Sequence, residues 1–310
     1  MVREKATLGI VLLTMGLFGS GVSASPTLAI DSAAADEPIK VLATLPILKD
    51  LVQEVGRDRV TVTSLLSGVE SEQTYSPKPT DILAIQDARM LVQIGLGLDT
   101  WVDALTKNAD NPRLLIITTS IGVPVLKNQN MTDRPDDPPG MRDPHIWLDP
   151  ENAKLMMRHI TEGFIKIDPT HKKDYLRNQA QYIQDLDQTQ QRLMVKLTPL
   201  RNKKIITHHA AWSYFARRFG FIIRGSIASQ IETEPSAKRL SDLVQMIKTE
   251  RIRVIVSEPQ LDQKLPQILA QETGARVVVL TQIPGALPGT ESYRSMIEYD
   301  VDQVVNALKD

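Results

Sequence analysis

A polar segment between Pro169 and Pro199 constrains the fold of this chain more than any other feature of the sequence. One stripe of apolar residues recurs in it at helical spacing, formed by Leu176, Ala180, Ile183, Leu186, Leu193 and Leu197. This pattern predicts one continuous helix with a thin apolar stripe. About 28 residues at about 1.5 Å each would span about 42 Å, a length that suits a bridge between two lobes. We therefore predict an N-terminal lobe (39–168), a connecting helix (169–198) and a C-terminal lobe (199–310).

On both sides of that segment, short apolar runs alternate with amphipathic segments. The runs that predict strands are 40–45, 60–66, 90–94 and 114–118 before it, and 204–207, 222–227, 254–257 and 277–280 after it. Strands that alternate with helices are typical of parallel sheets covered on both faces. We predict an α/β fold with two lobes, each a mainly parallel sheet flanked by helices, joined by one long rigid helix. No internal sequence repeat relates the two halves.

The N-terminal segment has the parts of a secretory signal peptide. A charged start over 1–5 precedes an apolar stretch over 6–22, and Val22-Ser23-Ala24 has the small-x-small form that signal peptidase accepts. We predict a signal peptide over 1–24 and a disordered lead-in of small and polar residues over 25–38. The alternative is an uncleaved membrane anchor, but the glycines in the apolar run favour cleavage.

Composition excludes several kinds of protein. The sequence contains no cysteine, so it offers no disulfide and no thiolate metal site. It also lacks a lipobox cysteine, so we expect a periplasmic protein that is not lipid-anchored. No later stretch approaches the roughly 20 apolar residues that a membrane span requires. The formal net charge is −1 without a basic stripe, and we therefore expect no nucleic-acid partner.

Histidines occur at five positions, and two sequence contexts among them indicate a site. His145 lies between two prolines at the entrance of a predicted helix. His208 and His209 follow the predicted strand 204–207, and ligands of open parallel sheets bind at the carboxyl ends of strands. Because successive strand residues point to opposite faces, we expect only one of these two in a site. His159 and His171 have polar helical surroundings, and we interpret both as surface residues.

Six short motifs then occur in the order found in one known family. They are YSPKPTD (75–81), GLGLDTW (95–101), DPHIWLDP (143–150), HAAWSYF (209–215), EPSA (234–237), and Ser292-Tyr293 with Met296 before Tyr299. On these motifs the chain resembles the cluster A-I (cluster 9) solute-binding proteins of zinc and manganese ABC transporters, over about residues 39–309. The resemblance implies a monomer that is not an enzyme, captures a divalent metal between two lobes and delivers it to an ABC permease and its ATPase.

The resemblance also implies four metal ligands, two from each lobe. By position they are Gln73, His145, His209 and Thr281. Gln73 stands where the family usually has histidine, and Thr281 where it usually has aspartate; Glu258, after the predicted strand 254–257, is the candidate substitute. Imidazole suits zinc, whereas manganese favours carboxylate-rich sites. We therefore expect Zn²⁺ rather than Mn²⁺ as the transported ligand, bound more weakly than where all four ligands are present.

Two other classes of function stay open at this point. The two changed ligand positions would suit a degenerate family member that does not transport metal and has an adhesion or sensory role. A metallohydrolase would hold zinc with His145 and His209 and use Glu258 as its base. The sequence has no HExxH motif, which disfavours the hydrolase. The turn-rich segment 127–143 adds acidic residues but no histidine.

Overall fold

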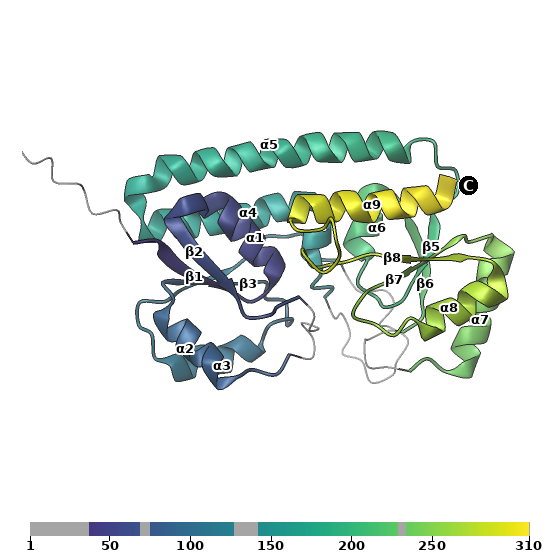
Figure 1. The fold of residues 1–310 in the computed structure, drawn as a ribbon, viewed down its shortest axis with the longest axis horizontal. Helices are drawn as coiled ribbons and strands as arrows, with labels where there is room; N and C mark the ends of the chain where they lie inside the picture. The colour runs from purple at the N-terminus through teal and green to yellow at the C-terminus, as the bar shows by residue number, and fades with distance from the viewer. Residues whose placement is uncertain (1–36, 69–74, 127–141, 229–233, 310) are drawn as a thin grey trace, which may run out of the picture. The chain divides into compact units, whose positions relative to one another are not determined.

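Two four-stranded sheets organise the chain, and every strand pair in them is parallel (Figure 1). The structure is a computed structural model that describes residues 37–68, 75–126, 142–228 and 234–309. The predicted signal peptide (1–24) and nearly all of the lead-in (25–38) lie outside these residues. No helix within the described ranges is both long and apolar enough to cross a membrane.

The two sheets have the same strand order. The first contains β1 (Ile39–Ala43), β2 (Val60–Ser64), β3 (Met90–Gln93) and β4 (Leu115–Thr118), in the order β2-β1-β3-β4. The second contains β5 (Lys204–Thr207), β6 (Ile222–Ser226), β7 (Val254–Ser257) and β8 (Arg276–Val279), in the order β6-β5-β7-β8. All four residues of β7 are buried, as expected of an inner parallel strand covered on both faces. The prediction of a two-lobe α/β fold is confirmed.

Helices connect the strands and cover the sheets. They are α1 (Pro46–Gly56), α2 (Pro79–Asp87), α3 (Trp101–Ala109), α4 (Pro150–Ile167), α5 (Lys172–Leu197), α6 (Ser213–Phe219), α7 (Ala237–Glu250), α8 (Lys264–Thr273) and α9 (Tyr293–Lys309). Short 3₁₀ turns are η1 (Arg57–Arg59), η3 (Ile146–Leu148) and η4 (Pro169–His171). α4 begins where its sequence predicts, because the Asp149 side chain accepts the N–H of Glu151 and Pro150 occupies the first turn.

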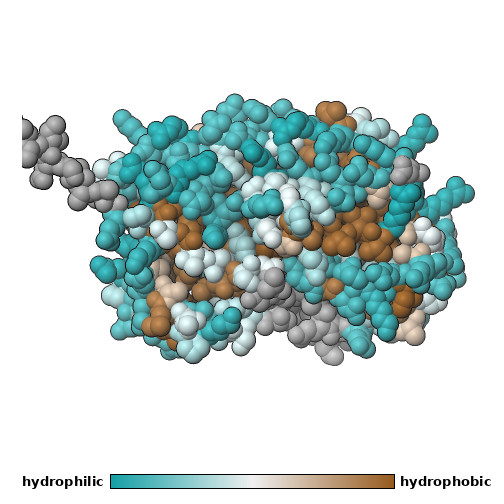
Figure 2. All heavy atoms as spheres, viewed as in Figure 1, coloured by the Kyte–Doolittle hydropathy of each residue, from teal (hydrophilic) through white to brown (hydrophobic). Residues whose placement is uncertain are grey.

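The predicted connecting segment forms one unbroken helix of 26 residues, α5. It contacts α1 and α4 from the first half and α9 from the second. Hydrophilic residues predominate along its outer face (Figure 2), although the helix also contains the exposed residue Val195. The helix starts later than its periodicity predicts, because residues 169–171 form the 3₁₀ turn η4. The lobe boundaries 39–168 and 199–310 stay a prediction.

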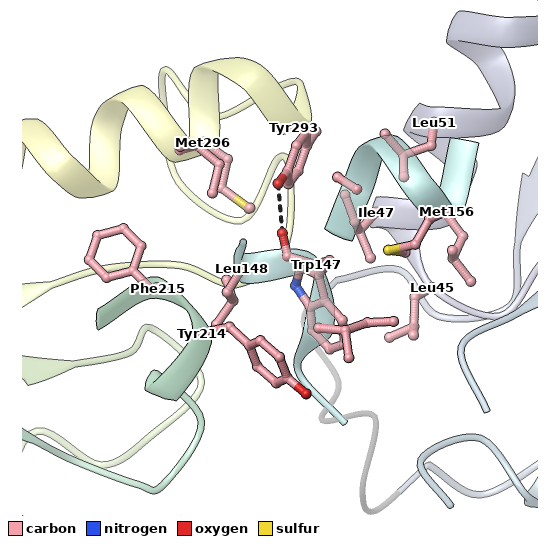
Figure 3. Close-up of a cluster of buried hydrophobic side chains, with 14 of the residues drawn as sticks. Leu45, Ile47, Leu51, Trp147, Leu148, Met156, Tyr214, Phe215, Tyr293 and Met296 are labelled. Atoms are coloured by element: carbon pink, nitrogen blue, oxygen red, sulfur yellow. Dashed lines mark hydrogen bonds between the residues drawn. The ribbon is translucent and has the colours of Figure 1, made fainter. Parts of the chain in front are cut away.

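One hydrophobic cluster extends through both halves (Figure 3). Leu51 on α1 and Trp147 on η3 belong to it, and so do Phe215 on α6 and Met296 on α9. Each of these four side chains is fully buried. Trp147 also donates its indole N–H to the carbonyl oxygen of Gln282, at 2.8 Å. The two halves therefore share a core, and this core holds the segments that carry the candidate site.

Candidate metal site

The first-half residue of the candidate site is His145, which directly precedes the turn η3. The three residues of η3 are completely buried, and the Asn152 side chain donates to the carbonyl of Ile146 at 2.9 Å. These contacts fix the backbone around His145, whose own exposure is only 2%. The histidine is thus held at the start of α4 by burial of its neighbours.

The second-half residue is His209, two positions after β5. Strand pairing continues up to His208, whose N–H donates to the carbonyl of Val256 at 2.7 Å. The two histidines then bind different partners, since Nδ1 of His208 lies 3.0 Å from the Ser257 hydroxyl and His209 contacts Glu258. Burial lowers the pKa of His208. Only His209 also contacts the first-half histidine.

The rings of His145 and His209 lie against each other at the junction of the two halves. Their centroids are 5.8 Å apart and their planes meet at 74°. Both residues are 2% exposed. Two buried imidazoles from opposite halves can present nitrogen donors to one cation, and imidazole nitrogen is a preferred ligand of zinc.

A carboxylate orients each of these imidazoles. Nδ1 of His145 lies 2.8 Å from Oδ1 of Asp143, and Nδ1 of His209 lies 2.9 Å from Oε1 of Glu258. Because a carboxylate only accepts, each Nδ1 carries the proton and each Nε2 carries a lone pair. Nε2 of His209 is buried and has no hydrogen-bond partner among the described residues. Metal-binding histidines typically have a carboxylate on the other ring nitrogen in this way.

Glu258 is fixed by more than His209. Its carboxylate also accepts the indole N–H of Trp212 at 2.8 Å and the side-chain amide of Gln282 at 3.1 Å. The residue is 3% exposed and follows β7 directly. Three donors around one carboxylate leave it well placed to hold the ring of His209 in a single orientation.

Thr281 lies beyond β8 with its polar groups engaged elsewhere. Its N–H donates to Asp300 at 2.9 Å, and its hydroxyl both donates to and accepts from the backbone of Ile283. Asp300 is fully buried, and this burial raises its pKa well above the usual range. The other expected ligand, Gln73, lies outside the described residues.

The structure therefore brings together two of the four expected ligand positions, His145 and His209. Within the described part of the chain, no three or more His, Cys, Asp or Glu residues surround one point in a metal-binding arrangement. Further ligands would have to be other residue types or residues outside the described ranges. His159 and His171 are partly exposed and bind the carbonyl of Ile121 and the carboxylate of Asp168.

Sequence reasoning assigned no role to Asp143, Trp212 or Gln282. Asp143 and Trp212 both lie in motifs that hold a site histidine, and Asp143 is two residues from His145. Gln282 comes to the site only through the packing of β7 beside β8. No local pattern in the sequence marks it.

The chain is similar to several proteins named for metal binding or metal uptake. A family model described as zinc-uptake complex component A, periplasmic (ZnuA) matches residues 41–307. A protein named as metal-binding from Treponema pallidum (strain Nichols) is 31% identical over 249 residues, 78% of each chain. The manganese-binding lipoprotein MntA of Halalkalibacterium halodurans is 24% identical over 310 residues, 98% of this chain and 99% of that one. A crystal structure of ZnuA matches 88% of this chain and 100% of its own, with a TM-score of 0.78 and 27% identity.

Proposed function

We propose that this chain, which belongs to the ZnuA family of periplasmic zinc-uptake components, captures a divalent transition metal and delivers it to an ABC importer. The observation that carries the proposal is the buried pair His145 and His209. The two imidazoles come from opposite halves, lie 5.8 Å apart by ring centroids, and each is oriented by a carboxylate at Nδ1. A metal ion bound by both would bridge the two halves.

Zinc is the metal that we propose in preference to manganese. The donors that the histidine pair offers are imidazole nitrogens, which suit zinc, while manganese favours direct carboxylate and water ligands. Asp143 and Glu258 contact the imidazoles through Nδ1 and so act one shell further out. Gln73 and Thr281 stay candidate ligands by position in the sequence, and their replacement by His and Asp should tighten binding if both positions line the site.

We propose a carrier rather than an enzyme. Hydrolysis at a zinc site needs a general base within reach of a metal-bound water. Glu258, the candidate base, is instead surrounded by three donors. The partners that we propose are an ABC permease and its ATPase, which would receive the metal from a monomeric carrier.

The proposed location is the periplasm, after cleavage of a signal peptide that ends at Ala24. The relative MntA is named a lipoprotein. The 310 residues of this chain contain no cysteine to which a leader lipid could be attached. We therefore propose that the mature protein is released rather than lipid-anchored.

Thermal denaturation with and without metal tests the proposed function. A ligand at a hundred times its Kd stabilises the folded state by about 2.7 kcal/mol, which should raise the Tm by roughly 5 °C or more. Zinc should give this rise and manganese a smaller one. His145→Ala and His209→Ala should each abolish most of it, because each removes a nitrogen donor.

His159→Gln is the matched control, because glutamine can still donate to the carbonyl of Ile121 and the residue lies outside the pair. This variant should keep the full rise. Absence of any zinc-induced shift in the unaltered protein, together with no metal after purification from a metal-replete host, would favour the degenerate adhesion or sensory alternative.

A further inference from the structure

We propose that one face of α6 positions His145 for metal capture by holding both ends of the segment 143–149, in which this histidine lies. The residues that hold the segment are Tyr214, Arg217 and Arg218, and we call them the α6 clamp. They come from the second half of the chain, whereas the segment comes from the first. This inference rests on the proposed function, since it concerns the spacing of the same histidine pair.

The end of the segment is held through the carboxylate of Asp149. Arg218 donates Nε to Oδ1 at 2.6 Å and Nη2 to Oδ2 at 3.1 Å, and Arg217 donates Nη2 to Oδ2 at 3.2 Å. A guanidinium that meets a carboxylate through two such bonds is restricted in both distance and angle. The side chain of Asp149 is only 1% exposed, so water screens this contact less than it screens an ion pair between two exposed groups. The contact therefore fixes α6 against the start of α4.

The start of the segment is held by the hydroxyl of Tyr214. It donates to the carbonyl of Asp143 at 3.2 Å and accepts the N–H of Leu126 at 2.9 Å. Tyr214 is fully buried, so both bonds are made away from bulk water. The Asp143 carboxylate contacts both the backbone N–H and Nδ1 of His145, at 3.0 Å and 2.8 Å. A fixed position for Asp143 therefore also fixes the ring of His145.

The two contacts of the clamp support each other. Its three residues lie on one face of α6, because residues three and four apart are neighbours on a helix surface. The guanidinium of Arg217 also lies over the ring of Tyr214, 5.3 Å from its centroid. Between the two held ends, α6 contacts the turn η3 (Figure 3). The segment is thus held at both ends and along its middle by one helix.

The same helix is linked to His209. Trp212, which directly precedes α6, donates its indole N–H to Oε1 of Glu258 at 2.8 Å, and Nδ1 of His209 contacts the same oxygen at 2.9 Å. One histidine is therefore tied to the start of α6 and the other is held across its face. Ligands that are already held in place lose less freedom when they bind, so the clamp strengthens metal binding without touching the metal.

Zinc affinity of conservative variants, measured by competition with a chromophoric chelator, tests the clamp. Arg218→Lys keeps the charge but not the two parallel bonds, and Tyr214→Phe keeps the ring but not the hydroxyl. Each should weaken zinc binding by about tenfold, the low end of the loss expected for a residue that orients a ligand. The absorption spectrum of the Co²⁺-saturated variants should match that of the unaltered protein, because no ligand is removed.

Arg224→Lys is the matched control. Arg224 makes the same kind of two-bond contact, with Glu250, but both residues belong to the second half and lie outside the clamp. This variant should bind zinc as the unaltered protein does. Equal weakening in Arg224→Lys and Arg218→Lys would show general destabilisation and would overturn the inference. A changed cobalt spectrum in the clamp variants would overturn a positioning role, because it would show that a ligand had been lost.

Spin labels on the two halves measure the spacing without any metal. The sequence contains no cysteine, so Leu83→Cys on α2 and Lys238→Cys on α7, both at exposed positions, provide two defined attachment points. The distance distribution of the metal-free protein should be narrow. In the Arg218→Lys and Tyr214→Phe backgrounds it should be broader and should narrow when zinc is added.

The inference and the proposed function can fail separately. If both clamp variants bind zinc as the unaltered protein does and keep a narrow distribution, while His209→Ala loses zinc, the inference is overturned and the proposed function stands. If the unaltered protein binds no zinc, the proposed function falls. Broadening in the metal-free clamp variants would in that case still show that α6 sets the spacing of the two histidines.

Discussion

The hydroxyl of Tyr293 donates a 2.6 Å hydrogen bond to the carbonyl of Trp147, deep in the core (Figure 3). Tyr293 is the first residue of α9, and Trp147 lies two positions after His145. Both side chains are fully buried. The last helix described in the chain is therefore bonded to the turn that holds one of the site histidines.

Tyr293→Phe should lower the free energy of unfolding by about 1–3 kcal/mol, because it leaves the buried carbonyl of Trp147 without its donor. Urea denaturation monitored by tryptophan fluorescence would measure this loss. Tyr299→Phe on the same helix, where the side chain is partly exposed, should stay within about 0.5 kcal/mol of the unaltered protein. Equal effects of the two replacements would argue against a specific role for the Tyr293 hydroxyl.

Asp143→Asn and Glu258→Gln should each weaken zinc binding by about 10–100-fold, although neither residue needs to touch the metal. Each carboxylate fixes the protonated nitrogen and the ring orientation of its histidine, and an amide can present a donor there instead. Isothermal titration with zinc measures the loss. Asp87→Asn, at an exposed carboxylate paired with Lys40, should bind zinc normally.

Asp50 should make stability depend on pH. Its carboxylate accepts the N–H of Tyr293 at 2.9 Å and the hydroxyl of Tyr182 at 3.5 Å. The charge of Glu54 raises the pKa of this carboxylate and the charge of Arg294 lowers it. Burial raises the pKa of Asp50 to about 6, against the lowering effect of the Tyr293 hydrogen bond. The folded state therefore binds this proton more tightly than the unfolded state does. Stability from this group is complete below about pH 4 and is lost as pH rises to about 6.

The raised pKa of Asp50 corresponds to a loss of folding stability on the order of 3 kcal/mol. Asp50→Asn keeps an acceptor for Tyr293 and cannot ionise. Relative to this variant, the unaltered protein should lose stability between about pH 4 and pH 6, with a constant difference above pH 7. Thermal denaturation of the two proteins across this pH range measures the loss of stability and the constant difference. Parallel curves for the two proteins would contradict the assignment to Asp50.

The mature protein should begin at Ser25 and fractionate with soluble periplasmic proteins. Cleavage after Ala24 follows from the small-x-small sequence at 22–24. Intact-mass spectrometry of a periplasmic extract would identify the first residue. A membrane-bound species that retains Met1 would contradict this prediction.

Much of the secondary structure could be predicted from the sequence, because the apolar runs and helix signals are local. The predicted strands 204–207 and 254–257 coincide with β5 and β7. The sequence pattern also predicts a helix from Leu98 to Lys107, but α3 begins only at Trp101. Gly95, Leu96 and Gly97 all have positive φ, a backbone conformation outside the helical region, so the chain turns before α3 can start.

The candidate site was only partly predictable, because its contacts join residues far apart in the chain. Sequence context identified His145 and His209, but their ring contact depends on how the two halves pack. The contact between Glu258 and Gln282 depends on β7 lying beside β8. The sequence also does not predict that the two sheets share one strand order, because different apolar sequences can form the same topology.

The core that runs through both halves also determines when this chain can finish folding during synthesis. α9 follows every other described element, yet it packs against α1, among the first. Until α9 emerges, Trp147 and its neighbours in the first half lack their apolar partners from the last helix, including Met296. The first half therefore cannot complete its apolar core before α9 is present. Loss of a few C-terminal turns should therefore damage the first half of the protein as much as the second.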